Sequence, residues 1–352
     1  MGFTLAAAVL AACTNLADYA VWRAPDAERN RRRLAQLNFG GTDQFVPTLK
    51  AIALNGILLA IVAHALIGIS LIWDKALLQK RGTQNLVSYV FWLGAISVFG
   101  LVLIPFGFSF PGLKLAGLGL LAGLLDLVAS YFYYSALKTG EASEELAAMG
   151  GFAPLATALI ALPLLNKPLG GQLAGFTVMT AGGFLMFLAE KRPLAKMLPK
   201  ILIASAAFGM TNVLQKIVFN GSGFVNGYVF FTTGTFLGSM ALLIPPSWRA
   251  QIRKYSGSKD QPRRKFRYFV NRFLAGVGSF LVVYAVSRTT PALVEAISGV
   301  RYVVIFLGAY AITRWRPSWF TEDFGKWPLI AKATATSLVI AGLVLVGLHG
   351  GT

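Results

Sequence analysis

Long apolar stretches alternate with short polar linkers along most of the chain. Each stretch of about twenty residues is long enough to cross a hydrocarbon core of about 30 Å. A helix satisfies its own backbone hydrogen bonds inside lipid, and the alternating segments typical of a membrane β-barrel are absent from the sequence. The pattern therefore predicts an all-α polytopic membrane protein.

Ten candidate spans follow one another, with boundaries set by the ends of the apolar runs. They cover residues 51–73, 86–106, 115–137, 145–165, 170–188, 201–218, 226–243, 269–286, 291–313 and 329–348. The linkers between them are short, except for the polar and basic linker 247–266. We therefore expect no separate soluble domain within this part of the chain.

Residues 1–50 form an N-terminal extension of a different character. The segment 3–22 is apolar but contains Asp18, and a basic run follows it at 29–33. A secretory signal carries its positive charge before the apolar stretch, so this order disfavours one. Cys13 ends a lipoprotein-like Leu-Ala-Ala-Cys box, but this interpretation also lacks the basic start. We expect an interfacial helix or an extra crossing here.

The composition narrows the class of protein further. Apolar residues make up 56% of the chain and charged residues only 13%, whereas a soluble domain has roughly a quarter of its residues charged. The net charge of +18 is explained by basic loops beside lipid headgroups rather than by nucleic-acid binding. One cysteine and two histidines exclude an internal disulfide and argue against a zinc site. We expect no metal, no cofactor and no nucleic-acid partner.

Short motifs recur in the two halves of the chain in the same order, which indicates an internal repeat. Tyr89-Val90-Phe91 recurs as Tyr228-Val229-Phe230, and Leu103-Ile104-Pro105 recurs as Leu243-Ile244-Pro245. A further set returns 150 residues later, where Tyr134, Lys138, Thr139 and Glu145 correspond to Tyr284, Arg288, Thr289 and Glu295. An odd number of spans in each half inverts the second half across the membrane. We predict ten transmembrane helices as two five-helix inverted repeats, at 51–190 and 197–350.

The chain resembles the EamA-like ten-helix members of the drug/metabolite transporter superfamily. The first half carries an aromatic-Ala-Leu exit from the third span, a proline in the fourth and a glycine-containing fifth: Tyr134-Ser135-Ala136-Leu137, Pro154, 172–175 and Ala181-Gly182-Gly183. Fainter matches in the second half are Tyr284-Ala285-Val286 and Ile340-Ala341-Gly342, so the resemblance covers 51–348. Two positions depart from the family pattern: Leu165-Asn166-Lys167-Pro168 replaces a frequent Leu-Gly-Glu, and Val304 replaces a ninth-helix proline.

The resemblance implies a secondary active transporter of small metabolites, commonly an exporter of amino acids, in the bacterial inner membrane. An organic-phosphate or nucleotide-sugar carrier, or a membrane protein without ion coupling, stays open as an alternative. The sequence has no cluster of catalytic residues and no phosphate-binding loop, which disfavours an enzyme and an ATP-driven pump. The expected partners are a small-molecule solute and the lipid bilayer, with a homodimer as an open option.

Three ionisable residues lie near the middle of predicted spans, where charge is costly and therefore indicates function. They are His64 in the first span, Asp126 in the third and Arg301 in the ninth. Asp126 is either a proton-coupling acid or the ion-pair partner of Arg301. Arg301 could instead bind a substrate carboxylate through its guanidinium fork. His64 is either part of a proton path or a helix-packing donor.

Four further candidates correspond in pairs across the repeat. Glu145 and Glu295 each open a predicted span, where the helix dipole stabilises a carboxylate; the alternative is a gate or a cation-binding pair. Tyr134 belongs to the aromatic cluster 131–134, and Tyr284 is its counterpart. An interfacial aromatic belt explains this cluster more simply than a substrate cage does.

The distribution of basic residues and the family resemblance predict opposite orientations. Linkers after odd-numbered spans hold 19 Lys and Arg, and those after even-numbered spans hold 3. The positive-inside rule therefore places the linker 247–266 in the cytoplasm and the C-terminus outside. The resemblance implies that both termini are inside, and the basic run 29–33 agrees with it. For ten spans the two orientations are mutually exclusive, so the orientation stays open at this point.

Overall fold

The computed structural model describes residues 42–79, 85–139, 142–165, 172–188, 194–256, 262–319 and 325–349. The regular elements within these ranges are all helices, which confirms the predicted all-α class. The N-terminal helix expected at 3–22 lies outside the described residues.

The helices of the first half follow the predicted apolar runs. They are α3 (Thr42–Gln79), α4 (Leu86–Ile96), the 3₁₀ helix η1 (Ser97–Phe106), α5 (Leu113–Thr139), α6 (Ala142–Leu165) and α7 (Gln172–Leu188). The second predicted span is therefore formed by α4 and η1 together. Gly107 ends η1 with a φ of 95°, a left-handed conformation that glycine adopts without steric cost.

The second half differs from the sequence prediction at two places. Its helices are α8 (Leu194–Ser222), α9 (Phe224–Ala241), α10 (Pro246–Ser256), α11 (Pro262–Arg288), α12 (Pro291–Ile297), α13 (Gly299–Trp315) and α14 (Lys326–His349). The ninth predicted span divides at Ser298 into α12 and α13. The helix α10 lies in the linker 247–266, where no apolar run of membrane-spanning length marks a helix.

Six helical segments in the described ranges are long and apolar enough to cross a membrane: Gly56–Leu77, Leu86–Phe106, Leu113–Lys138, Leu198–Ser222, Phe266–Arg288 and Leu293–Trp315. The bent pair of α9 and α10 also passes this test, which brings the number to seven if the pair is one span. Phe152–Leu165 and Leu173–Gly182 are shorter apolar helices. These helices indicate an integral, polytopic membrane protein.

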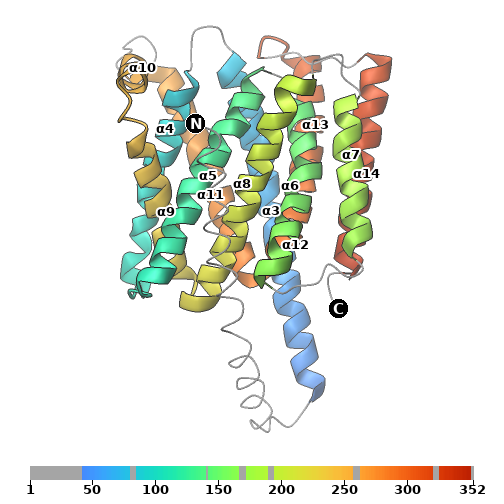
Figure 1. Ribbon diagram of the computed structural model, residues 1–352. Coiled ribbons are helices and arrows are strands. Elements are labelled where there is room, and N and C mark those ends of the chain that lie inside the picture. Colours follow the sequence, from blue (N-terminus) through green and yellow to red (C-terminus); the bar gives the residue numbers. More distant parts are fainter. Residues whose placement is uncertain are drawn as a thin grey trace.

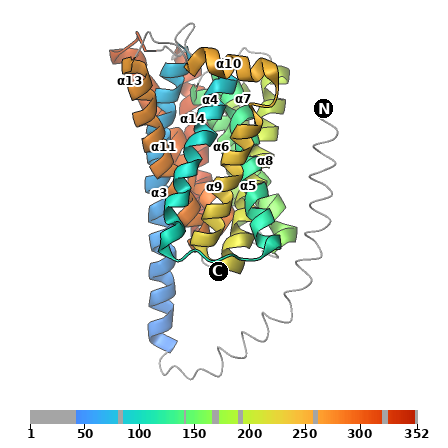
Figure 2. The same ribbon diagram turned by 90° about the vertical axis from the view of Figure 1, so that its left-hand side faces the viewer.

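The helices stand side by side in one bundle (Figures 1 and 2). The N-terminal part of α3 extends beyond the bundle at the end where α12 lies (Figure 1). The helix α10 lies across the opposite end and makes an angle of 99° with α9. We name these two ends of the bundle the α12 end and the α10 end.

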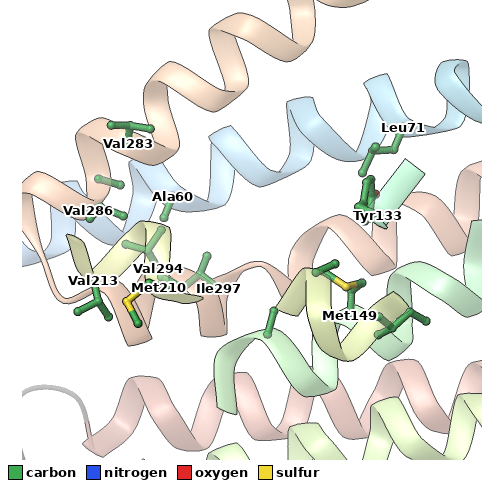
Figure 3. Close-up of a cluster of buried hydrophobic side chains, with 14 of the residues drawn as sticks. Ala60, Leu71, Tyr133, Met149, Met210, Val213, Val283, Val286, Val294 and Ile297 are labelled. Carbon is green, nitrogen blue, oxygen red and sulfur yellow. The ribbon is translucent and has the colours of Figure 1, made fainter. Parts of the chain in front are cut away.

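Apolar side chains from both halves form one large buried cluster (Figure 3). Its labelled members include Ala60 of α3, Met210 and Val213 of α8, Val283 and Val286 of α11, and Val294 and Ile297 of α12. The helix α3 packs mainly against α11 and α13. The first span is therefore packed into the second half of the chain, and polar side chains on α3 can reach partners there.

The helices α5 and α9 cross at glycines that face each other's backbone. A Cβ at Gly123 would overlap the Phe231 carbonyl oxygen and lie 2.9 Å from the backbone carbon of Gly234. A Cβ at Gly234 would overlap the Leu120 carbonyl oxygen. Small residues at such a crossing let two membrane helices approach closely and gain van der Waals contact.

Gly123→Val is expected to lower the free energy of unfolding by about 1–3 kcal/mol, because the added side chain overpacks the crossing. The measurement is thermal unfolding of the detergent-solubilised protein, followed by tryptophan fluorescence. Gly117→Val on the same helix is the matched control, since a Cβ there meets nothing within 4 Å. An equal loss in both variants would show that helix propensity, and not the crossing, sets the cost.

Candidate functional site

A buried ion pair joins α3 to α11 near the α10 end. The Arg272 guanidinium donates to both carboxylate oxygens of Asp74. The relative exposure of the two residues is 5% for Arg272 and 0% for Asp74. A bidentate arginine–carboxylate pair of this kind is both strong and directional.

Three polar neighbours complete the hydrogen bonding of the Asp74 carboxylate. The Tyr89 hydroxyl and the Asn271 side-chain amide donate to Oδ1, and the Tyr134 hydroxyl donates to Oδ2 over 3.2 Å. The Arg272 guanidinium carbon also lies 5.1 Å from the Tyr89 ring centroid, a cation–π distance. A buried ion pair is stable only when such additional bonds offset the loss of hydration. We name this group of five residues the Asp74–Arg272 cluster.

Sequence reasoning missed both charged residues of this cluster. Asp74 was placed in the linker after the first span, because the apolar run ends at Trp73, but the helix continues to Gln79. Arg272 lies within the predicted span 269–286, and a guanidinium inside an apolar run was the signal that could have identified it. The interfacial-belt interpretation of Tyr134 is wrong, since Tyr133 and Tyr134 are buried and Tyr134 bonds to Asp74.

A second polar cluster surrounds the junction between α12 and α13. At Ser298 the backbone hydrogen bonds join residues three apart instead of four. Ser298 N donates to Glu295 O, and Arg301 N donates to Ser298 O, with a distance of 3.0 Å in each bond. The His64 side chain of α3 donates through Nε2 to the carbonyl oxygen of Val294, over 3.0 Å. A local tightening inside a span, with a side chain bonded to the helix backbone, is typical of a hinge.

The His64 ring connects α3 to Arg301 of α13. Arg301 Nη2 donates to His64 Nδ1 over 2.9 Å, while Nε2 donates to Val294 O. One ring nitrogen therefore accepts and the other donates, which requires the neutral imidazole with its proton on Nε2. Gly68, one turn further along α3, keeps α13 near, since a Cβ there would lie 3.1 Å from Arg301 O.

Glu295 and Asn212 complete this second cluster. Asn212 Nδ2 of α8 donates to Glu295 Oε1 over 2.7 Å, and Glu295 is 7% exposed. Arg301 lies within electrostatic range of the Glu295 carboxyl group. The Nε of Arg301 is buried and has no hydrogen-bond partner among the residues that the structure describes. We name His64, Asn212, Glu295 and Arg301 the junction cluster.

The structure places the remaining candidates as follows. The suggested pair of Asp126 and Arg301 is wrong: Arg301 bonds to His64, and within the described ranges no ion pair joins it to Asp126. Asp126 instead lies within electrostatic range of Tyr228 on α9. The expectation that Glu295 sits at a helix start is also wrong, because Glu295 lies inside α12, where its carboxyl group bonds to Asn212.

The last two candidates are Tyr284, which lies apart from both clusters, and Glu145. The Tyr284 hydroxyl accepts from Arg288 Nε over 3.1 Å, at the C-terminal end of α11. The Glu145 backbone lies in the first turns of α6, and its side chain is outside the described residues. Among the described residues, no group of three or more His, Cys, Asp or Glu could hold a metal ion.

A protein-family model matches the first half of the chain. Residues 54–189 match the model of the EamA-like transporter family, which belongs to the drug/metabolite transporter superfamily. A solved structure titled "Crystal structure of protein" is similar at 15% identity and a TM-score of 0.49, over 86% of this chain and 98% of that chain. No curated protein matches the chain. The family match confirms the resemblance for residues 54–189, while the resemblance of the second half stays a prediction.

The Asp74–Arg272 pair generates a test of stability. Asp74→Asn and Arg272→Gln are each expected to lower the free energy of unfolding by about 3–5 kcal/mol, because each leaves a buried charge without its partner. The double variant should lose much less free energy of unfolding than the sum of the two single losses. Chemical unfolding in detergent measures all three, and Arg288→Gln, which removes an exposed arginine from the same helix, is the control. Strict additivity of the two single losses would contradict the pairing.

Proposed function

We propose that this EamA-like chain is a secondary active transporter of a small zwitterionic metabolite, with its solute site at the junction cluster. The observation that carries the proposal is a set of buried polar side chains, from α3, α8, α12 and α13, around an interruption in a membrane span. Irregular helix positions that face polar side chains are where secondary transporters bind solutes. Ionisable groups at this depth are costly and are kept for function.

The charges of the junction cluster favour one solute class over the alternatives. Arg301 carries a positive charge, and its buried Nε has no partner in the described part of the chain, which suits a carboxylate. Glu295 lies nearby and suits an ammonium group, while His64 is neutral in this arrangement. The cluster therefore has no net charge when Glu295 is ionised. Such a site suits an amino acid better than a multiply charged organic phosphate or nucleotide sugar.

Two equivalent lysine contacts support the arrangement as inverted five-helix repeats. Lys75, near the end of α3, donates to Leu137 O at the end of α5, over 2.9 Å. Lys216, near the end of α8, donates to Val286 O and Ser287 O at the end of α11, each over 3.1 Å. In each proposed repeat a lysine of the first helix thus bonds to carbonyl oxygens at the C-terminal end of the third helix. The first contact lies at the α10 end and the second at the α12 end, as an inversion requires.

The two ends of the bundle differ in a way that suits alternating access. The α10 end is held by the Asp74–Arg272 cluster. The corresponding aromatic group at the α12 end consists of Phe224, Tyr228, Phe280 and Tyr284. Within the described stretches no ion pair joins the helices there. The conformation is therefore proposed to be closed at the α10 end.

Basic side chains support a cytoplasmic position for the α10 end. The exposed ones there are Lys138, Arg249, Arg253, Lys254, Arg267, Arg314, Arg316 and Lys326. The positive-inside rule places such an end in the cytoplasm, in the bacterial inner membrane that the family suggests. A conformation closed towards the cytoplasm is one of the two states that an exporter of metabolites must visit.

Arg301→Lys is expected to reduce uptake at low solute concentration by about 10–100-fold, because the ammonium group loses the forked hydrogen bonds to a carboxylate. The measurement uses purified protein in liposomes and a panel of labelled amino acids, organic phosphates and nucleotide sugars. Arg314→Lys, an exposed arginine on the same helix, is the matched control. Saturable uptake of phosphate compounds alone would contradict the zwitterion assignment, and unchanged uptake by Arg301→Lys would contradict the site.

Asp126→Asn tests proton coupling, which is proposed because Asp126 is a membrane-embedded acid without an ion-pair partner in the described part of the chain. In wild type, an imposed pH gradient should drive solute uptake, and a protonophore should abolish this effect. The variant should keep solute exchange in the absence of a gradient but lose the response to the gradient. Gradient-driven uptake by the variant would remove Asp126 from the coupling role. No response in wild type would favour a carrier without ion coupling.

A further inference from the structure

The helix α10 turns away from α9 and lies across one end of the bundle. Its axis makes an angle of 99° with α9, which runs along the bundle (Figure 2). A helix at a right angle to the spans, placed at their ends, has the geometry of a helix in the plane of the membrane interface. This geometry was not visible in the sequence, where the segment belongs to a polar linker.

One side of α10 is apolar and is held by the bundle. Ile252 is 4% exposed and packs with Trp248 against Val87 and Phe91 of α4. The Trp248 ring also stacks on Tyr131 of α5, with centroids 6.5 Å apart. The helix is therefore fixed in place by its own protein, and its apolar face needs no further partner.

The other side of α10 is basic. Arg249, Arg253 and Lys254 are exposed, and Arg249 and Arg253 are four residues apart and so share one face of the helix. The sequence of α10 contains no Asp or Glu that could neutralise them. Arg267, in the second turn of α11, is exposed as well. A row of fixed positive charges therefore faces away from the bundle.

Exposed aromatic side chains mark the level of the membrane interface at this end. Trp315 at the end of α13 is 76% exposed, and Trp327 at the start of α14 is 82% exposed. Both helix ends lie at the α10 end of the bundle (Figure 1). Tryptophan at the ends of spans is typical of the headgroup level. The basic face of α10 is thus held at the depth of phosphate headgroups.

We propose that α10 is a binding surface for the headgroups of anionic phospholipids, which Arg249, Arg253 and Lys254 contact through their phosphate groups. Each basic residue held at this level attracts an anionic lipid surface, and three on one short helix act together. Charge complementarity selects anionic over zwitterionic lipids, because phosphatidylcholine offers a choline cation beside each phosphate. This proposal is independent of the proposed transport activity.

The contacts of α10 also connect the lipid surface to the closed end of the bundle. The Asn85 side chain, which caps the N-terminus of α4, donates to Gln251 of α10. One turn further along α4, Tyr89 donates to Asp74. Anionic lipid that fixes α10 therefore steadies α4 beside the Asp74–Arg272 cluster, and it should stabilise this conformation.

Thermal unfolding in a neutral detergent tests the lipid surface directly. Phosphatidylglycerol added to wild type should raise the unfolding temperature more than an equal amount of phosphatidylcholine does. The triple variant R249Q/R253Q/K254Q should lose most of this difference, with an apparent affinity for phosphatidylglycerol weaker by about tenfold or more. The matched control R314Q/R316Q/K326Q removes three exposed charges from the same end and should keep the difference.

Several results would overturn the proposal. An α10 triple variant that keeps the full phosphatidylglycerol effect would do so, as would an equal loss in both triple variants. Should the α10 variant fold poorly, wild type alone still decides the question. The rise in its unfolding temperature on addition of phosphatidylglycerol must become much smaller as salt approaches about 1 M, where the Debye length is about 3 Å. A salt-insensitive effect, or equal protection by soluble glycerol phosphate, would rule out an electrostatic lipid surface on α10.

Discussion

The cost of burying charge inside a lipid-embedded bundle determines where the polar side chains of this protein lie. A carboxylate or guanidinium there is stable only when protein groups replace its hydration. The Asp74–Arg272 cluster does so with a bidentate pair and three further donors. The junction cluster does so with side chains from four helices. Both clusters include one residue of α3 and partners from the second half of the chain, so the two halves are joined by polar contacts as well as by apolar packing.

The position of α3 therefore couples the two clusters. His64 and Asp74 are ten residues apart on this helix, which is about 15 Å along its axis. In the proposed transport cycle, a solute that replaced His64 as the partner of Arg301 would remove one polar contact between α3 and α13. The same helix carries the carboxylate that holds α11 through Arg272. A displacement of α3 would therefore change the proposed solute site and the Asp74–Arg272 cluster together, as the proposed alternating access requires.

Most of the helices could be predicted from the sequence because hydropathy and length are local properties. The errors lie where a polar residue is stabilised by a distant partner. The predicted first span stops just before Asp74. In the structure the ion pair with Arg272, almost two hundred residues later, stabilises Asp74 inside the helix bundle. The junction at Ser298 was missed too, although the adjacent Ser298-Gly299 pair is a known cause of helix kinks. The helix α10 was missed because only its contacts with α4 and α5 reveal its apolar face.

The residues of the candidate site could be predicted better than their pairing. His64 and Arg301 are candidates from residue type and depth alone, since an ionisable group in an apolar run is conspicuous, and Glu295 is a candidate because it corresponds to Glu145 across the repeat. Their partners depend on which helices are neighbours, and the sequence does not give this. Asp126 was matched to Arg301 because the two have opposite charges and similar predicted depths. In the bundle α3 is the neighbour of α13, so His64 takes that place. Asp126 is thereby left as an acid without an ion-pair partner in the described residues, and this position is the physical basis for the proposal that it exchanges protons.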